Sequence, residues 1–362
     1  MDRPSESAAP GSSPRLPEQA FGFTGTGAEY FGIWIVNLLL TIVTFGVYSA
    51  WAKVRRLQYF YRHTSVAGSS FDFHGSPIRI LVGRVIALAM LLAYNYSVRL
   101  RSPLTIVILV SIAIVMPWLL RNSFRFRLYN SSWRGARFHF RGTAAGAYRV
   151  FLLNGFLTLI TLYLFAPFMH QRLKAYQHGN SWFGRTRCSF HAGVGQFYVT
   201  YLLAAAGLVA AGILLAVSGV GSGLAALLQA QKHGGHVNPY LMLRALAVIY
   251  GVLILLAISI GPAFHALITN LIWSNTRVGE HRIECRMSPL VLIGITLSNL
   301  LAVVLTLGLF SPWALVRVAR YQLESMRLVP ATDLQEFVDA EPETIGAVGE
   351  EAATAFDFDI AL

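Results

Sequence analysis

Long apolar runs alternate with basic, aromatic-rich stretches along this 362-residue chain. Seven runs reach about 18 residues with few charges, which is the length a helix needs to cross a bilayer. Backbone groups inside a bilayer must be paired within the chain, and these runs lack alternating β patterning, so we expect helices. The pattern predicts an all-α polytopic membrane protein with about seven transmembrane helices. The runs cover residues 30–51, 78–98, 103–120, 146–168, 195–218, 241–264 and 289–313.

The segment around the end of an apolar run recurs along the chain. Residues 21–59 align without gaps on residues 138–176, and residues 37–59 align on residues 299–321. Weaker copies occupy residues 116–142 and 261–285. Each element is an apolar span, a basic aromatic stretch suited to an interfacial helix, a His or Asn followed by Ser or Thr, and a strand-like segment. The sequence therefore predicts an internal repeat of span, interfacial helix and short strand.

The strand-like segments, such as SSFDFHG (69–75) and ARFHFRG (136–142), alternate apolar and polar residues as half-buried strands do. An isolated strand is unstable, so we expect these segments to pair into small sheets beside the bilayer. The two cysteines, Cys188 and Cys285, fall on apolar positions of such segments. This favours packing over disulfide or metal chemistry.

Two membrane topologies are compatible with the basic residues. If all seven runs cross and the N-terminus is outside, a modest majority of loop cations faces the cytoplasm. In the alternative, the runs at 30–51, 146–168 and 289–313 re-enter on one side, four helices cross, and every basic segment shares one face. We take seven crossings as the prediction, keep re-entry as the alternative, and expect the C-terminus in the cytoplasm.

Composition and charge support this class of protein. The chain is 55% hydrophobic and 13% charged, whereas soluble domains carry about 25% charged residues. Of the 17 acidic residues, nine follow Pro330 and three precede Phe21, while 27 of the 29 basic residues lie between. We expect a cationic membrane domain at 21–329, a disordered N-terminal tail at 1–20 without the apolar core of a signal peptide, and an acidic disordered tail at 330–362.

Cations in the loops of a membrane protein usually meet anionic headgroups, and no nucleic-acid-binding motif is present. We therefore expect the lipid bilayer, with its anionic headgroups, as the partner, and no nucleic acid. A collar of aromatic and basic residues follows the apolar runs, where aromatic rings suit the membrane interface. The collar candidates are Trp51, Arg55, Tyr59, Trp118, Arg172, Tyr176, Trp313, Arg317 and Tyr321.

Polar residues also recur inside the three best-matched runs. An Asn precedes a Thr by seven residues in each, about two helical turns, so both lie near one helix face. Hydrogen bonds between related helices are one explanation. The other is that these faces converge on a path for a polar solute. The candidates are Asn37, Thr44, Asn154, Thr161, Asn299 and Thr306.

Evidence for other chemistry is weak. The sequence has no hydrolase, nucleotide-binding or zinc-protease motif and no paired carboxylates, so we expect no enzyme activity and no cofactor. His233 and His236 are too few for a metal site, and we predict a polar loop there and no metal. His265, just past a span, suits an interface position as well as a polar pathway.

The strings NLLLTIVTFGVYSAWAKVR (37–55) and LTLGLFSPWALVR (305–317) resemble the signature of the YjgN-like family of bacterial inner-membrane proteins. The resemblance covers roughly residues 21–329. It implies a multi-span inner-membrane protein of unknown biochemical function and supplies no catalytic residues. From the residues themselves we predict a transporter or channel-like protein for a polar solute. The alternative is a non-transporting membrane scaffold or lipid-headgroup-binding protein.

Overall fold

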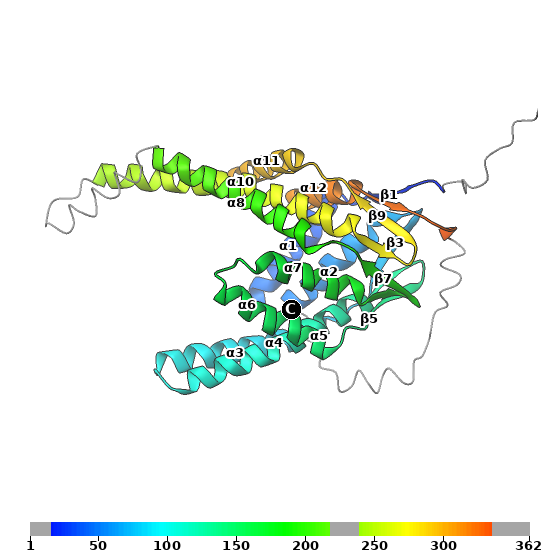
Figure 1. Cartoon of the computed structure of the whole chain (residues 1–362), viewed down its shortest axis with the longest axis horizontal. Coiled ribbons are helices and arrows are strands. Elements are labelled where there is room, and N and C mark those ends of the chain that lie inside the picture. Colours follow the sequence, from blue (N-terminus) through cyan, green and yellow to red (C-terminus); the bar gives the residue numbers. More distant parts are fainter. Residues whose placement is uncertain (1–15, 218–238, 335–362) are drawn as a thin grey trace, which may run out of the picture.

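The computed structural model describes residues 16–217 and 239–334, with strands gathered at one end and helices at the other (Figure 1). Ten strands in the described residues close into one antiparallel barrel, in the order β1-β10-β9-β8-β7-β6-β5-β4-β3-β2. They are β1 (Gln19–Phe23), β2 (Thr64–Val66), β3 (Ser69–Phe73), β4 (Ser131–Trp133), β5 (Ala136–Phe140), β6 (Ser181–Phe183), β7 (Thr186–Phe190), β8 (Thr276–Val278), β9 (His281–Cys285) and β10 (Met326–Val329).

Four hairpins and one pairing of distant segments form the barrel within the described residues. In β2–β3, for example, Ala67 and Gly68 reverse the chain with φ values of 49° and 75°, a conformation that glycine adopts readily. β1 and β10 supply the fifth pair, in which Gln19 lies opposite Leu328. The first and last strands are therefore neighbours on the same side of the helices.

Side chains fill the barrel. Phe183 is 2% exposed, and its ring centroid lies 5.0 Å from that of Phe138 and 5.8 Å from that of Trp133. The interior is thus a packed hydrophobic core and not an open channel. Five cross-strand pairs carry inward-facing residues around the ring: Phe21–Val66, Phe71–Trp133, Phe138–Phe183, Cys188–Val278 and Ile283–Leu328.

The predicted all-α fold is therefore wrong. The expected strands exist, but they form one closed barrel and not separate small sheets. Each strand has only three to five residues, and at least one of its two partners is distant in the sequence. Such strands are stable only when closure leaves no unpaired edge, and no single stretch of sequence signals that closure.

Helical hairpins leave the barrel and return to it. Their helices are α1 (Gly27–Val43), α2 (Ser49–Arg62), α3 (Pro77–Arg99), α4 (Leu104–Tyr129), α5 (Ala144–Tyr148), the π-helical turn η1 (Arg149–Leu153), α6 (Asn154–Ile160), α7 (Ala166–Gly179), α8 (Val194–Val217), α10 (Pro239–Ser274), α11 (Pro289–Leu305) and α12 (Ser311–Glu324). We call α2, α4, α7, α10 and α12 the return helices, because each leads into a short strand. The hairpins α3–α4 and α8–α10 extend farther from the barrel than the others (Figure 1).

Three of the seven predicted spans are short hairpins and not single helices. Phe45 and Gly46 end α1 with φ values of 49° and 91°, and Leu307 and Gly308 end α11 with 50° and 94°. The turn between α6 and α7 uses the same left-handed conformation. The segments 30–51, 146–168 and 289–313 therefore turn back toward the barrel, as in the re-entrant alternative.

Two helices in the described residues are long and apolar enough to cross a membrane, α3 and α4. Only 11% of the most apolar window of each is buried within the protein, so neither is a covered core helix. The prediction of seven transmembrane helices is wrong. The error came from the length of the apolar runs. The turns of the short hairpins are themselves apolar, so a hydropathy profile does not show where the chain reverses direction.

Because β1 pairs with β10, these two strands must lie on the same side of a membrane. Seven crossings would instead place them on opposite sides. The ten described strands lie between Gln19 and Val329, so the barrel begins two residues before the predicted membrane domain at 21–329. Residues 1–15 and 335–362 of the two predicted tails lie outside the described residues, as do His233 and His236. Gln19 and Ala20, which the prediction placed in the disordered N-terminal tail, belong to β1.

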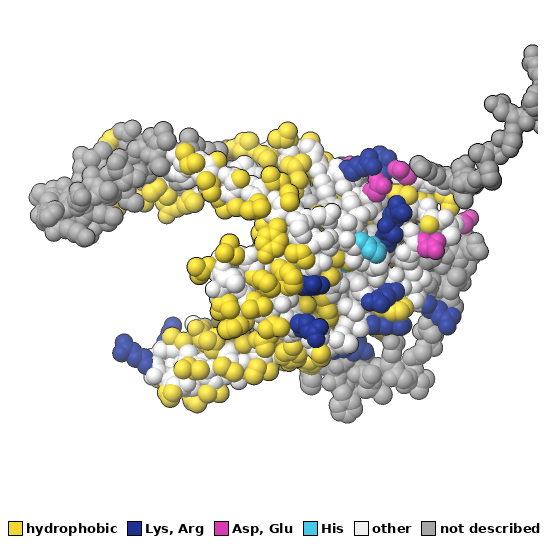
Figure 2. Space-filling model, in the orientation of Figure 1, with side chains coloured by type: hydrophobic (Ala, Val, Ile, Leu, Met, Phe, Trp, Pro, Cys, Tyr) yellow, Lys and Arg dark blue, Asp and Glu magenta, His cyan; other side chains and the backbone are white. Residues whose placement is uncertain are grey.

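Hydrophobic side chains cover the helical end of the molecule, whereas acidic and most basic side chains visible on the same face lie over the barrel (Figure 2). The tips of the short hairpins are the most exposed apolar points. Phe45 is 98% exposed, Leu307 is 95% exposed and Leu162 is 85% exposed. Exposed apolar surface on this scale marks contact with a membrane or another protein.

Candidate functional site at the helix–barrel junction

The three collar tyrosines lie inside the protein. Tyr59 and Tyr176 are 6% and 8% exposed, and their hydroxyls donate to the backbone oxygens of Thr26 (2.8 Å) and Thr143 (2.9 Å). Burial raises the pKa of each phenol to about 12, and the charge of Glu29 adds to the effect at Tyr59. Tyr321, half-buried, accepts a hydrogen bond from the backbone N–H of Ser288 at 2.7 Å. These tyrosines fasten return helices to the starts of neighbouring helices and do not reach headgroups.

The collar arginines are exposed. Arg55 donates to the hydroxyl of Tyr48 at 3.1 Å, and the guanidinium of Arg172 lies 4.9 Å from the ring centre of Phe168. Arg317 donates to Asn299 Oδ1 at 2.8 Å. The three arginines hold equivalent places on α2, α7 and α12, one per short hairpin. They form a distributed surface and not one pocket.

The collar tryptophans are half-buried. Trp51 stacks on Tyr48 with ring centroids 6.2 Å apart. Trp313 packs between helices, 5.0 Å from the ring of Phe31 and so close to Gly27 that a side chain there would collide with it. Trp118, next to Pro117 inside α4, is also half-buried. Trp313 thus joins α12 to α1, a packing role.

The three asparagines of the predicted polar face are buried, with 6% to 8% exposure. Asn299 receives the bond from Arg317 and donates to the backbone oxygen of Ala314 at 3.3 Å, so it joins the two helices of its own hairpin. Asn37 and Asn154 occupy the matching places on α1 and α6. Among the described contacts, none links one asparagine to another.

The three threonines cap the hairpin turns. Thr44 donates to the backbone oxygen of Leu40 at 2.7 Å and accepts from the backbone N–H of Tyr48 at 2.9 Å. Thr161 and Thr306 repeat both contacts in their turns. With the asparagines inside hairpins, the threonines in turns and the barrel filled, these residues give no support to the predicted transport path.

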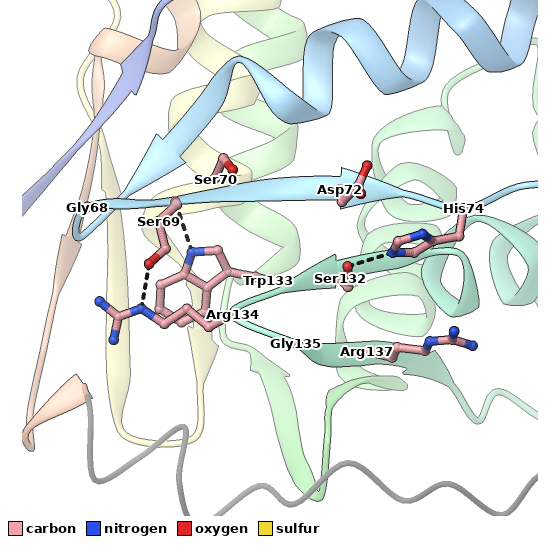
Figure 3. Close-up of a pocket in the computed structure, with 10 residues that line it drawn as sticks. All are labelled: Gly68, Ser69, Ser70, Asp72, His74, Ser132, Trp133, Arg134, Gly135 and Arg137. Atoms are coloured by element: carbon pink, nitrogen blue, oxygen red, sulfur yellow. Dashed lines mark hydrogen bonds between the residues drawn. The ribbon is translucent and has the colours of Figure 1, made fainter.

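A pocket of about 600 Å³ lies on the outer wall of the barrel (Figure 3). His74 Nε2 lies 2.9 Å from Ser132 Oγ, an arrangement that resembles a base and nucleophile pair. Asp72, however, accepts from Arg62 and from the backbone N–H of Phe73. No described hydrogen bond joins Asp72 to His74, so the geometry of a catalytic triad is missing. The lining residues are Gly68, Ser69, Ser70, Asp72, His74, Ser132, Trp133, Arg134, Gly135 and Arg137.

The outer barrel surface is rich in arginine. Exposed examples are Arg137, Arg141, Arg185, Arg187, Arg282, Arg286 and Arg327. Alternation places some of these on the strands opposite the buried core positions, and sequence reasoning missed this because it did not assemble the strands into a barrel. Within the described residues, no group of three or more His, Cys, Asp or Glu side chains is placed to hold a metal ion.

An apolar, exposed helical end joined to an arginine-bearing barrel is typical of proteins that contact a membrane or another protein. Residues 18–355 match the family described as "Bacterial protein of unknown function (DUF898)", and the chain belongs to that family. The match confirms the YjgN-like family that the repeated strings suggested.

Curated relatives share part of the sequence. Inner membrane protein YjgN of Escherichia coli O157:H7 is 29% identical over 136 residues, 37% of this chain and 34% of the relative. YjgN of Escherichia coli (strain K12) is 29% identical over 132 residues, 36% of this chain and 33% of the relative. YjgN of Salmonella typhimurium (strain LT2) is 24% identical over 146 residues, which are 39% of this chain and 36% of the relative. The matched segment thus spans about a third of each relative, and no solved structure matches the chain.

Proposed function

We propose that this is a bacterial inner-membrane protein that binds anionic phospholipids where its helices meet its barrel, and that it acts as a membrane scaffold. The observation that carries the proposal is the separation of surfaces in Figure 2: an apolar helical end and a charged barrel end. Membrane-exposed helices lower their free energy by burying such side chains in hydrocarbon, while guanidinium groups stay among phosphates and water.

In this arrangement α3–α4, the two helices that meet the length and hydropathy of a span, cross the bilayer. The hairpin of α8 and α10 is proposed to cross beside them because it also extends far from the barrel (Figure 1), and the three short hairpins dip into the bilayer and return. The barrel and both chain ends then lie on one side. The cytoplasmic side is favoured because cytoplasmic loops of membrane proteins carry the excess of Lys and Arg. The protein is accordingly multi-pass, with four crossings and a cytoplasmic C-terminus.

An internal repeat accounts for the barrel. The unit is a return helix, a short strand, a turn and a long strand, and it recurs five times if β10 and β1 form one split unit. The register supports this, because the central residue of each long strand pairs with the last residue of the next short strand in four units, and Leu328 takes that place opposite Ile283.

The collar arginines provide the test. Purified protein in nanodiscs of phosphatidylglycerol or phosphatidylcholine is compared for thermal stability and for retained lipid. Arg55→Gln with Arg172→Gln should weaken the preference for phosphatidylglycerol about fivefold per residue, because each cation near an anionic surface contributes about 1 kcal/mol. Arg317 is excluded, since it also bonds Asn299.

Arg185→Gln with Arg282→Gln is the matched control. Both arginines are exposed on the barrel, and both lie in or beside turns at the end away from the helices. This pair removes the same charge and should leave the lipid preference unchanged. An equal preference for both lipids in the unmodified protein would refute the proposed function.

A further inference from the structure

The pocket on the outer wall of the barrel carries a positive charge that its own carboxylate does not balance. Arg134 and Arg137 line the pocket together with one carboxylate, Asp72. Asp72 accepts a hydrogen bond from Arg62 at 2.9 Å, so this carboxylate already has a cation of its own. No ion pair among the described residues involves Arg137. The pocket has a volume of about 600 Å³ and three serines in its lining, and this combination suits an acidic ligand.

Arg134 is held in place by the barrel itself. Its Nε donates to Ser69 Oγ at 3.0 Å, and its Nη2 donates to the backbone oxygen of Ala67 at 2.6 Å. The guanidinium carbon also lies 4.9 Å from the ring centre of Trp133. None of these three contacts neutralises the charge. An arginine fixed in this way loses little side-chain freedom when it binds a carboxylate, and this favours binding.

The two arginines lie toward opposite ends of the pocket (Figure 3). Arg134 lies in the β4–β5 turn, near Gly68 of the β2–β3 turn, whereas Arg137 lies on β5. The guanidinium carbon of Arg137 is 5.3 Å from the ring centre of Tyr129, the last residue of α4, so this side chain points toward the helices. The pocket is therefore an elongated strip along the strands, a shape that suits an extended acidic peptide.

Residues 335–362 of this chain have the opposite charge. They contain eight Asp and Glu residues and no Lys, Arg or His. Glu341 and Glu343 stand on either side of Pro342. Proline fixes its own φ and disfavours a helix for the residue before it, so the sequence favours an extended stretch here, with the Cα atoms of the two glutamates at most about 7 Å apart. Two carboxylates with this spacing match two arginines that are three residues apart.

The chain enters this acidic segment at the same end of the barrel as Arg134. β10 ends at Val329, which pairs with Arg282 beside the β8–β9 turn, and that turn lies away from the helices like the β4–β5 turn. Leu334, the last described residue, packs against the hydrophobic cluster that includes Trp133. The segment is thus tethered to the barrel, and a short tether raises the effective concentration of a ligand to the order of millimolar.

The length of the chain is sufficient for this contact. The order β10-β1-β2-β3-β4 puts four strand spacings between β10 and β4, or about 19 Å along the wall at about 4.8 Å each. Glu341 lies seven residues beyond Leu334. An extended chain covers about 3.3 Å per residue, so these seven residues reach about 23 Å.

We propose that residues 335–362 dock on the outer wall of the barrel, where Arg134 and Arg137 bind the carboxylates of Glu341 and Glu343. The contact lies on the barrel and not at the collar, so it is independent of the proposed lipid binding. Water reaches Arg137, which is exposed, and salt screens exposed charges. Docking should therefore weaken as the ionic strength rises.

Photo-cross-linking of the 362-residue chain tests the docking. A benzophenone amino acid replaces Ser70, an exposed residue of the pocket, and the irradiated protein in nanodiscs is digested and mapped by mass spectrometry. The expected product is a cross-link to residues 335–362 within one chain, with a lower yield at high salt. A cross-linked dimer, which would place a second copy in the pocket, overturns the proposal, and so does the absence of any cross-link to this segment.

Charge removal on each side identifies the contact. Arg134→Gln with Arg137→Gln should lower the yield of the cross-link about threefold or more, because two charge-assisted contacts are lost. Glu341→Gln with Glu343→Gln should lower it to the same extent. The glutamate pair changes no residue of the barrel, so it keeps the test decisive if the arginine pair does not fold. An unchanged yield in the glutamate pair overturns the proposal.

Glu350→Gln with Glu351→Gln is the matched control. It removes the same charge from the same segment, farther from Leu334. This pair should keep most of the cross-link, because its carboxylates do not meet the two arginines. A loss as large as that of Glu341→Gln with Glu343→Gln would mean that net charge alone attracts the segment, and the assignment of the two glutamates to the pocket would be wrong.

The collar variants separate this proposal from the proposed function. Arg55→Gln with Arg172→Gln should weaken the preference for phosphatidylglycerol and leave the cross-link unchanged. Arg134→Gln with Arg137→Gln should lose the cross-link and keep the lipid preference. A missing cross-link in an unmodified protein that prefers phosphatidylglycerol rejects the docking alone. A cross-link in a protein without lipid preference supports the docking and rejects the proposed function.

Discussion

Tyr59 on a return helix donates its hydroxyl hydrogen to the backbone oxygen of Thr26, which caps the helix before it, at 2.8 Å. The same contact joins Tyr176 to Thr143, again 33 residues apart. In both cases the tyrosine closes a loop that contains an entire short hairpin. One hydrogen bond therefore fixes where the hairpin leaves the barrel and where it returns.

Tyr176→Phe should destabilise the protein by about 1 kcal/mol, because it removes one buried hydrogen bond, while the Thr143 oxygen keeps its bond from the backbone N–H of Ala147. The measurement is unfolding by SDS or heat in detergent. Tyr163→Phe is a matched control, since Tyr163 is 69% exposed at a hairpin tip. Equal stability of the two variants would mean that the Tyr176 contact does not hold the hairpin.

These tyrosines also predict a limit to stability at high pH. Their pKa values are raised to about 12, so the folded protein holds its phenolic protons more tightly than the unfolded chain, in which a tyrosine has a pKa of about 10. The resulting stabilisation is complete below pH 10 and is lost as the pH rises through 12. Unfolding followed between pH 9 and pH 12 should show this loss, and Tyr59→Phe with Tyr176→Phe should flatten the profile.

The repeated strings allowed the repeated unit to be predicted but not the fold. Alternation in SSFDFHG correctly predicted a strand, which the structure places at Ser69–Phe73. Nothing near that strand indicates that Phe71 lies opposite Trp133, or that Leu328 lies opposite Ile283 to help close the ring. Barrel closure depends on pairs distant in sequence, whereas patterning reports only which face of a strand is apolar.

For the candidate residues, too, the sequence predicted one property and not another: it predicted which positions are equivalent but not what they do. Their repetition indicated equivalent places, and the structure confirms that equivalence for Thr44 and Thr306, which make the same two contacts. Their function was less predictable. A Thr in an apolar run can line a path or cap a turn, and only the backbone reversal at Phe45 and Gly46 decides between these roles.

The turn glycines offer a test of the short hairpins. Gly308→Ala should destabilise the protein by about 1–2 kcal/mol, because φ is 94° there and a side chain disfavours that conformation. Gly32→Ala is the control. It lies within α1 with open space around it, so alanine should be neutral or stabilise by up to about 1 kcal/mol. A continuous helix through residues 289–313 would reverse the result at Gly308, and SDS unfolding of both variants distinguishes the two structures.

The packed barrel core makes another prediction. Phe183→Ala should cost about 3–5 kcal/mol, since Phe183 is 2% exposed and touches the rings of Phe138 and Trp133. Phe45→Ala, at a 98% exposed hairpin tip, should change stability in detergent by much less. The comparison is made by thermal unfolding followed by tryptophan fluorescence. A mild effect at Phe183 would indicate a loosely filled barrel and would reopen the question of a channel through it.

Membrane sidedness can be tested with introduced cysteines. The native thiols should not react with a maleimide, because Cys188 and Cys285 are 6% and 3% exposed and burial raises the pKa of Cys188 to about 12. Glu280→Cys lies in the exposed β8–β9 turn, at the barrel end away from the helices, and Leu100→Cys at the far end of α3. A membrane-impermeant maleimide should label Glu280→Cys only in inverted vesicles and Leu100→Cys only in spheroplasts.

The hairpin tip completes this experiment. Phe45→Cys should resist the impermeant reagent from both sides, because a re-entrant tip ends within the hydrocarbon, and it should react once detergent exposes it. If residues 30–51 instead crossed the membrane, the chain on either side of Phe45 would emerge on opposite faces. Cysteines at Gln19 and Arg62 would then label from different sides. The barrel requires the same side for both, since β1 and β2 are paired strands.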